Sequence, residues 1–221
     1  MNNYTKHSNP VNSNTVLNGE PLISDVYLMD CMDLMKQYPD NYFDLAVVDP
    51  PYGININSSG RLGHYGGKKN WDISTPNNDY FIELFRISKN QIIWGGNYFQ
   101  LPPNRCFLIW DKQQPQDVSF ASCEYAWTYF DKSAKTFYQR PQCADKERIH
   151  PTQKPVALYD WIFKNYASEG MTIIDTHLGS GSSRIAANKA KLHFVACELD
   201  ADYFNAQNKR YEEFISQLRI I

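Results

Sequence analysis

Hydrophobic positions along the chain predict buried strands that alternate with amphipathic helices. Short, nearly continuous apolar runs are typical of strands in a sheet covered on both faces, and they occupy 26–30, 43–49, 91–94, 107–110, 124–129, 171–175 and 194–198. Apolar residues at helical spacing predict helices over 31–38, around 81–87, and over 155–167, 182–190 and 201–218. This alternation indicates the α/β class.

The last third of the chain has the clearest pattern. A predicted strand ends at Asp175, a glycine turn follows at 179–181, and a helix then leads to a strand that ends at Glu198. This order is a crossover unit, which makes the two strands parallel and their connection right-handed. We therefore expect an open, doubly wound, mostly parallel sheet. The expected order of strand ends across it is Asp30, Glu198, Asp175, Asp49.

Three segments lack this periodicity. Residues 1–20 are rich in Asn and Ser and predict a loosely ordered tail, followed by a single domain over 21–221. Within that domain we expect loop insertions at about 53–75 and at about 131–152. The first loop has the Gly- and Asn-rich composition of a lid or binding segment, and the second gathers basic residues.

Composition narrows the function classes. The chain has 221 residues, and 22 Lys and Arg against 24 Asp and Glu give a formal net charge of −2. Nucleic-acid binding must therefore rest on a local basic patch. No apolar run reaches the length of a membrane span and the first residues are polar, so we expect a cytoplasmic protein that does not interact with a membrane. The 5 cysteines lack Cys-x-x-Cys spacing and indicate neither a disulfide framework nor a metal site.

The glycine turn at 179–181 gives the first sign of a ligand. Glycines beyond a parallel strand let a small molecule approach the backbone, close to the amides that open the next helix. Glu198 ends the following strand, where an acidic side chain can accept hydrogen bonds from a ribose. Together they predict an adenosine-containing ligand, with an ordinary strand-to-helix turn as the alternative. Arg184 occupies the place of the third glycine of a dinucleotide fingerprint, which argues against a nicotinamide oxidoreductase.

The segment Asp49-Pro50-Pro51-Tyr52 indicates a more specific chemistry than the glycine turn does. Its two prolines stiffen the turn and remove two backbone donors. The Asp49 oxygen and the Pro50 carbonyl can accept the two hydrogens of a planar amino-heterocycle while Tyr52 stacks on its face. Acceptors placed in this way stabilise the positive charge that develops when the amino nitrogen attacks a strong electrophile such as a sulfonium methyl group. Such a reaction needs neither a metal nor a covalent nucleophile.

These motifs, in this order, resemble the beta class of DNA amino methyltransferases, in which the catalytic half precedes the half that binds S-adenosylmethionine. The resemblance extends from Val26 to Tyr211. It rests on Asp30-Cys31, the segment 49–52, Trp-Gly-Gly-Asn-Tyr-Phe at 94–99, Trp-Asp-Lys at 110–112, His-Pro-Thr-Gln-Lys-Pro at 150–155, the turn at 179–181 and Glu198. It implies a Rossmann-like methyltransferase fold, circularly permuted with the catalytic half first.

The resemblance also implies an activity and its residues. The activity is transfer of a methyl group from S-adenosylmethionine to the exocyclic N6 of adenine in DNA, with S-adenosylhomocysteine as product and no metal. The catalytic residues implied are Asp49, Pro50, Pro51 and Tyr52. The cofactor-binding residues implied are Asp30, Cys31, Asp49, Thr152, Lys154, Asp175, His177, Gly179, Ser180, Gly181 and Glu198. Of these, Asp30 is expected at the adenine of the cofactor, Glu198 at its ribose, and Thr152 and Lys154 at its carboxylate.

Some alternatives stay open. Aspartate in the first place of the catalytic motif favours adenine N6, but N4-cytosine and RNA amino methyltransferases are related enzymes. A catalytically silent nucleic-acid-binding subunit would keep the same fold. Thr176 and His177 stand where the family usually has Pro-Phe, so the His177 ring is expected to replace the phenylalanine contact. The resemblance is compatible with a homodimer and with a place in a restriction-modification system.

DNA must also reach the site. A base paired inside a duplex is inaccessible, so the target has to be flipped out of the helix. The basic residues expected to contact phosphates are Arg61, Lys68, Lys69, Lys132, Lys135, Arg140 and Arg148. They lie in the two loop insertions, which we therefore expect to read the DNA sequence.

Overall fold

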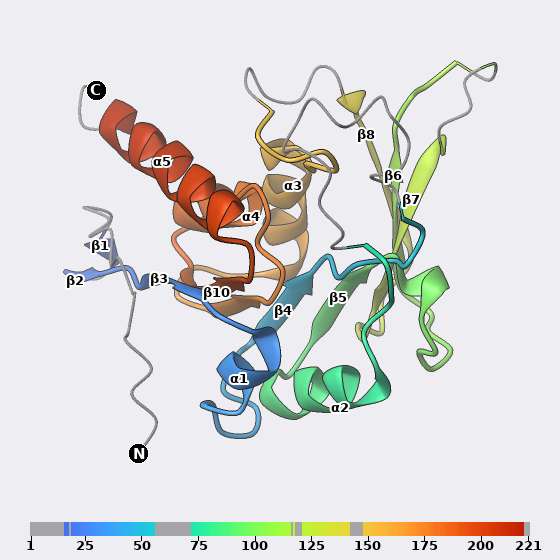
Figure 1. Ribbon diagram of the computed structural model, residues 1–221, viewed down its shortest axis with the longest axis horizontal. Helices are drawn as coiled ribbons and strands as arrows, with labels where there is room; N and C mark the ends of the chain where they lie inside the picture. Colours follow the sequence, from blue (N-terminus) through green and yellow to red (C-terminus); the bar gives the residue numbers. More distant parts are fainter. Residues whose placement is uncertain are drawn as a thin grey trace.

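A computed structural model of the chain describes residues 16–17, 19–55, 72–115, 117, 121–141 and 148–218. Its main sheet has the strand order β3 (Ser24–Leu28), β10 (His193–Glu198), β9 (Thr172–Asp175), β4 (Leu45–Val48), β5 (Gln91–Trp94), β7 (Cys123–Thr128), β6 (Phe107–Asp111) and β8 (Lys135–Tyr138) (Figure 1). Within these ranges, no helix has the length and apolar composition needed to cross a membrane.

The sheet has a parallel part and an antiparallel part. Strands β3, β10, β9, β4 and β5 run parallel to one another. Strand β7 is antiparallel to both β5 and β6, whereas the edge strand β8 is parallel to β6. The predicted order of strand ends, Asp30, Glu198, Asp175, Asp49, is confirmed by the order β3, β10, β9, β4.

Helices cover both faces of the sheet (Figure 1). One face carries α3 (Val156–Tyr166), α4 (Ser182–Lys189) and α5 (Ala201–Leu218), and the other carries α1 (Cys31–Met35) and α2 (Asn78–Ile87). Strand β4 shows why both layers are needed. Val47 is buried in the apolar cluster under α3 and α4, whereas Ala46 and Val48 are buried under α1 and α2. A strand that is apolar on both sides requires cover on both sides, and the predicted doubly wound α/β fold is confirmed.

Some strands lie where the sequence predicts none. Strand β8 falls inside the predicted loop at 131–152, and β1 (Val16–Leu17) pairs with β2 (Glu20–Pro21) at the end of the predicted tail. The residues of β8 are mostly exposed, so the strand lacks the apolar alternation on which a sequence-based prediction depends. Residues 1–15 and 18 of the predicted tail, 56–71 of the first predicted loop and 142–147 of the second lie outside the described residues. That the order of the two halves is a circular permutation stays a prediction.

Candidate active site

A cavity of about 880 Å³ lies at the carboxyl edge of the parallel strands. Its wall includes residues that follow four neighbouring strands: Asp30 after β3, Glu198 at the end of β10, His177 after β9 and Asp49 after β4. Open α/β sheets bind ligands at this edge, and the volume is in the range of small-molecule sites. Asp49 and Glu198 are thus parts of one site, although they lie far apart in the sequence.

The turn at 49–52, called the proline turn below, is held by two carboxylates. The Tyr52 hydroxyl donates to Asp49 Oδ1 at 2.5 Å. The backbone N–H groups of Tyr52 and Gly53 both donate to Asp72 Oδ1, each at 2.8 Å. Asp72 is buried and comes from the far end of the predicted loop at 53–75. Its side chain therefore fixes the backbone that presents the Tyr52 ring.

The Tyr52 ring packs against the segment after β5. Tyr98, at the end of the short helix η2 (Gly96–Tyr98), stacks on it with ring centroids 4.9 Å apart and an interplanar angle of 12°. Gly95 lies so close that a Cβ placed there would be 2.1 Å from a Tyr52 ring carbon. The φ of Gly95 is +70°, a conformation that side chains rarely adopt. Only glycine fits at this position while Tyr52 keeps its place.

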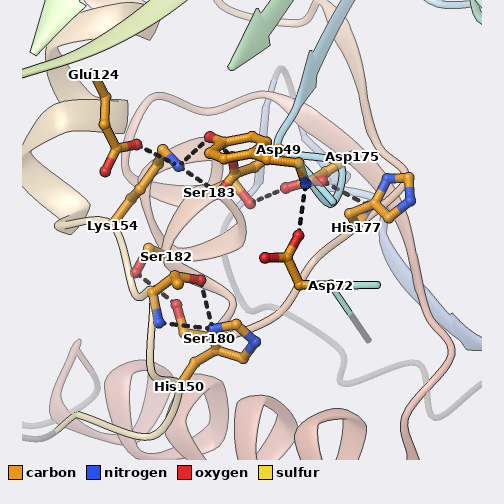
Figure 2. A network of polar contacts seen from close by, with 12 residues as sticks. Asp49, Asp72, Glu124, His150, Lys154, Asp175, His177, Ser180, Ser182 and Ser183 are labelled. Atoms are coloured by element: carbon orange, nitrogen blue, oxygen red, sulfur yellow. Dashed lines mark hydrogen bonds and ion pairs between the residues drawn. The ribbon is translucent and has the colours of Figure 1, made fainter. Parts of the chain in front are cut away.

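A buried lysine lies at the centre of a charge network behind the proline turn (Figure 2). Lys154 Nζ is 2.5 Å from Asp49 Oδ2 and 3.0 Å from Glu124 Oε2, and it donates to the Tyr52 hydroxyl at 3.2 Å. Its side chain is only 3% exposed. Glu124 has a second cationic partner, Lys112, at 2.6 Å. The network thus pairs two carboxylates with two ammonium groups.

Within this network, burial and ion pairing shift the pKa values of the charged groups in opposite directions. Burial raises the pKa of Asp49, Glu124 adds to the rise, and Lys154 opposes it, so the pKa stays above the usual range. Burial lowers the pKa of Lys154, but the charges of Asp49 and Glu124 raise it by more. The pKa of Glu124 is lowered to about 2, because its two lysine partners outweigh its burial. Lys154 is therefore held as a cation.

The segment after β9 approaches Glu198 through its backbone. Gly179 N–H donates to Glu198 Oε2 at 2.8 Å, and Asp200 N–H donates to Oε1 at 2.9 Å. Burial raises the pKa of Glu198, whereas these donors lower it by less. The carboxylate is thus fixed in the cavity wall. Each of its oxygens can accept one more hydrogen bond.

Two predicted cofactor-binding residues, Asp175 and Gly181, lie behind this wall rather than in it. Asp175 is buried, accepts from the Ser183 hydroxyl at 2.6 Å and accepts from the His177 N–H at 3.1 Å. Gly181 opens α4 with a φ of +73° and faces Gln207. That these two residues touch the cofactor stays a prediction. They shape the turn that carries Gly179.

His177 lies in the cavity wall beside Tyr80. Its Nδ1 is 3.0 Å from Thr176 Oγ1, which is in turn 2.7 Å from the Tyr80 hydroxyl. Burial lowers the pKa of His177 to about 4, so the ring is neutral at physiological pH. The polar pair Thr176–His177 is therefore satisfied by a hydrogen-bonded chain, and the ring leaves the cavity open.

A sequence model of the DNA methylase family matches residues 108–209. The chain is related to the DNA methylases. One curated relative, Type II methyltransferase M2.MboI of Moraxella bovis, is 24% identical over an alignment that covers 88% of this chain and 90% of that protein. The expected resemblance to DNA amino methyltransferases is confirmed.

Solved methyltransferase structures share the fold. The M1.HpyAVI–SAM complex matches with a TM-score of 0.54 at 18% identity, covering 84% of this chain and 98% of that chain. PvuII DNA methyltransferase (cytosine-N4-specific) matches with a TM-score of 0.59 at 12% identity, covering 87% and 90%. A cytosine-N4-specific enzyme is therefore among the proteins that share this architecture.

In this DNA methylase relative, most of the predicted site residues line the cavity. They are Asp30, Cys31, Asp49, Pro50, Pro51, Tyr52, Thr152, Lys154, His177, Gly179, Ser180 and Glu198. Their individual roles stay predictions. Among the described residues, no group of three or more His, Cys, Asp or Glu side chains is placed to hold a metal ion.

The predicted phosphate contacts are only partly placed around the cavity. Lys132 and Lys135 precede or begin β8, which runs parallel to β6, so they lie at the sheet edge opposite the cavity. There both ammonium groups donate to Asn165 near the end of α3. These two lysines therefore lie away from the cavity, and their contact with DNA phosphates stays a prediction.

Two other predicted phosphate contacts lie on segments nearer the cavity. Arg140 follows β8 at the cavity edge, and Arg148 donates to the carbonyl oxygens of His150 and Pro151. Arg61, Lys68 and Lys69 lie outside the described residues. Arg140 and Arg148 therefore remain the described candidates for contact with DNA near the cavity.

Four residues that sequence reasoning missed contribute to the site: Asp72, Tyr98, Lys112 and Glu124. Each comes from a segment whose position next to the proline turn depends on how the chain folds back. Lys112 and Tyr98 do lie in motifs that resemble the family, so the motifs at 110–112 and 94–99 could have indicated them. Glu124 and Asp72 have no such local signal.

Proposed function

We propose that this DNA methyltransferase transfers a methyl group from S-adenosylmethionine to the exocyclic N6 of an adenine flipped out of DNA. The observation that carries the proposal is that a single cavity is lined both by the proline turn and by the segment after β9. The amino group and the methyl donor can therefore lie side by side.

The side of the cavity around Glu198 fits an adenosine compound. The acceptors of Glu198 and Asp30 come from the ends of the adjacent strands β10 and β3. Glu198 would hold the ribose hydroxyls and Asp30 the adenine amino group, which are hydrogen-bond donors. When bound, S-adenosylmethionine supplies a methyl group on positively charged sulfur.

We assign Lys154 a role different from the one that the sequence resemblance implies. The sequence resemblance implies a contact with the carboxylate of the cofactor, but its ammonium is already shared by Asp49 and Glu124. We therefore assign that contact to Thr152, whose hydroxyl lies beside His150 in the cavity wall. Lys154 belongs to the half of the site that receives the base.

The proline turn supplies the groups that the amino nitrogen needs. Asp49 and the Pro50 carbonyl accept its two hydrogens, which favours a tetrahedral nitrogen and stabilises the positive charge that it gains. The nitrogen–carbon bond forms as the carbon–sulfur bond breaks, its electron pair stays on sulfur, and one amino proton leaves. Because burial raises the pKa of Asp49, this carboxylate accepts a proton more readily than an exposed aspartate.

The choice of adenine rests on the residue in the first place of the proline turn. An aspartate there favours N6 of adenine over N4 of cytosine by resemblance to the family. Delivery to the cavity requires the base to leave the duplex, at a cost of a few kcal/mol. Salt weakens phosphate contacts, so transfer to duplex DNA should fall as ionic strength rises.

The test is transfer of tritiated methyl groups from S-adenosylmethionine to unmethylated duplex DNA, followed by mass spectrometry of the nucleosides. We expect N6-methyldeoxyadenosine from the wild type. The Asp49→Ala variant should lose about 10²–10³-fold or more in kcat. The matched Asp160→Ala variant, which removes a partly exposed carboxylate paired with Lys189 outside the cavity, should keep the wild-type rate.

Each other outcome overturns a stated part of the proposal. N4-methyldeoxycytidine as the product would contradict the base, but not the methyl transfer. Label in RNA and none in DNA would contradict the substrate. Full transfer by Asp49→Ala would contradict the role of the proline turn. Duplex binding by a protein that binds no S-adenosylmethionine would favour a silent nucleic-acid-binding subunit.

A further inference from the structure

The reacting half of the site includes a carboxylate that the proposed reaction does not yet use. Glu124 lies on β7, in the antiparallel part of the sheet, where it pairs with Trp110 of β6. Its side chain is 22% exposed and extends into the cavity wall behind the proline turn. Glu124 is the second carboxylate on the ammonium group of Lys154 (Figure 2).

The ammonium group of Lys154 has three polar neighbours in this part of the site. They are Asp49 Oδ2, Glu124 Oε2 and the Tyr52 hydroxyl, at 2.5, 3.0 and 3.2 Å. The ammonium also lies 5.3 Å from the ring centroid of Trp94. The contacts with Asp49 and Tyr52 are hydrogen bonds, and the contact with Glu124 is an ion pair. The position of the ammonium is therefore set jointly by two carboxylates and two aromatic rings.

Both carboxylate oxygens of Asp49 already accept a hydrogen bond within the protein. Tyr52 donates to Oδ1 and Lys154 to Oδ2, and the amino group of a target base must donate to one of the same oxygens. A cation bound to Asp49 alone would draw electron density from this carboxylate and oppose the positive charge that develops on the amino nitrogen. A second anion beside the cation reduces both effects.

We propose that Glu124 is a positioning residue for methyl transfer, because it shares the Lys154 ammonium with Asp49 and so leaves Asp49 able to accept from the target amino group. This inference rests on the proposed function. Lys112, 2.6 Å from Glu124 and 5.1 Å from the Trp110 ring centroid, holds Glu124 from the other side. The antiparallel part of the sheet thereby contributes to catalysis without touching the substrate.

The charges around Asp49 predict the direction in which its pKa should change when Glu124 or Lys112 is substituted. The titratable groups that act on Asp49 or respond to it come from the proline turn, β7, the segment before α3, α3 and β9, and they are Tyr52, Glu124, Lys154, Tyr159 and Asp175. Lys112, from the segment after β6, acts on Glu124. The negative charge of Glu124 raises the pKa of Asp49. Its removal should therefore lower that pKa, and removal of Lys112 should raise it by leaving the Glu124 charge less compensated.

The experiment measures kcat and KM from pH 5 to 9 for wild type, Glu124→Gln, Glu124→Asp and Lys112→Gln. We expect Glu124→Gln to lose about 10-fold in kcat, less than a group in direct contact would cost, with an unchanged KM for S-adenosylmethionine. The acid limb of its kcat profile should move to lower pH, since this limb reports ionisation of Asp49 in the complex. Glu124→Asp should recover part of the rate.

Lys112→Gln should move the acid limb in the opposite direction, to higher pH, and it keeps the test valid should Glu124→Gln fail to fold. Glu169→Gln is the matched control, because it breaks a lysine–glutamate pair outside the cavity, and it should leave the profile unchanged. An unchanged limb in both Glu124→Gln and Lys112→Gln, or shifts of the same sign, would overturn the inference. No transfer by the wild type would instead overturn the proposed function.

Discussion

Lys154 and Arg184 are both buried cations, and the two regions that hold them balance the charge differently. Lys154 lies among carboxylates at the cavity, and its pKa is raised by them although burial lowers it. Arg184 lies on α4 with no exposed surface and donates to Ser24, Gln207 and Asn208, which are neutral. Its guanidinium also lies 3.9 Å from the Tyr211 ring centroid.

The two buried cations therefore have different roles: Lys154 lies beside the groups that would react, whereas Arg184 joins elements of the fold. Burial lowers the pKa of Arg184 to about 10, which leaves the group charged under physiological conditions. Its four hydrogen bonds join α4 to β3 and α5, so this cation works as a multivalent hydrogen-bond donor. The Lys154 network also joins several segments, but in addition it sets the charge beside the groups that would react. Arg184 stabilises the fold through the arrangement of its hydrogen-bond donors, whereas Lys154 acts on the site through its charge.

The largest effect should come from Lys154→Met, which leaves Asp49 and Glu124 buried side by side without their shared cation. Breaking a buried pair in this way costs about 3–5 kcal/mol of unfolding free energy. The pKa of Asp49 should rise, because Lys154 normally lowers it. The acid limb of activity should then move to higher pH.

The stability of Lys154→Met should also depend on pH in a defined sense. A carboxyl group whose pKa is raised in the folded state costs stability when ionised, so the loss should shrink as pH falls through that pKa. Urea unfolding at pH 5 and pH 8 measures it. Lys89→Met, which breaks a surface pair with Asp44, is the control and should cost less than about 1 kcal/mol.

Arg184→Met should affect stability alone. The variant fills similar space but leaves the oxygens of Ser24, Gln207 and Asn208 without their donor, and we expect a loss of about 2–3 kcal/mol. The kcat of the folded fraction should stay at the wild-type value. Lys164→Met, on the exposed side of α3, should change neither quantity. A loss of kcat as large as that of Lys154→Met would remove the distinction between the two regions.

Asp175 lies between these two regions. Substituting it tests how burial changes the pKa of a carboxyl group whose hydrogen-bond donors are neutral. Burial raises its pKa from 3.8 to about 7, and the donors Ser183 and His177 offset only part of that rise. The ionised form is therefore costly in the folded state, and this cost appears as pH rises from about 4 to about 7. Asp175→Asn should gain about 2 kcal/mol relative to wild type across that window.

Asp175→Asn keeps the local hydrogen bonds, because an amide oxygen can accept from His177 and the Ser183 hydroxyl can turn to accept from the amide. Denaturant unfolding at pH 4.5 and pH 7.5 gives the difference. Asp160→Asn, whose carboxylate is partly exposed, serves as the control. Equal changes at both pH values would mean that Asp175 stays ionised throughout.

The smallest effect should come from Asp72→Asn. The amide oxygen can still accept from the N–H groups of Tyr52 and Gly53, but the bonds lose the assistance of a charge. We expect a loss of about 1 kcal/mol in unfolding free energy and a modest fall in kcat. Asp72→Ala removes the acceptor and should cost more in both. If Asp72→Ala matched wild type in kcat, the proline turn would hold its shape without this carboxylate.

The sequence predicts the parallel part of the fold and its cavity edge because each strand there is a short apolar run that ends in a distinctive residue. The order Asp30, Glu198, Asp175, Asp49 follows when the segment at 49–52 and the turn at 179–181 are also required to face one crevice. The edge strand β8 has no such signal, since its exposed residues carry no apolar period. Without β8, the sequence places Lys132 and Lys135 in a loop expected to read DNA, whereas their strand begins at the edge opposite the cavity.

The proline turn can be predicted because its functional groups are consecutive in the sequence. The residues that support it are distant in the sequence and cannot be predicted in this way. Glu124 and Asp72 act from segments whose own sequence shows only a strand and a loop. The sequence predicts ligand contacts for Asp175 and Gly181 because strand-end motifs report position along the chain and not depth below the cavity wall. The charge network arises only when β6, β7 and the segment before α3 come together in the folded chain.

The most direct test of the central claim is a crystal structure of the protein with S-adenosylmethionine, or a stable analogue, and duplex DNA containing the methylated sequence. We predict a flipped adenine whose N6 lies within about 2.6–3.2 Å of an Asp49 oxygen and of the Pro50 carbonyl. Lys154 should still lie between Asp49 and Glu124. A target base bound away from the proline turn, or a cofactor bound outside the cavity beside Glu198, would contradict the account.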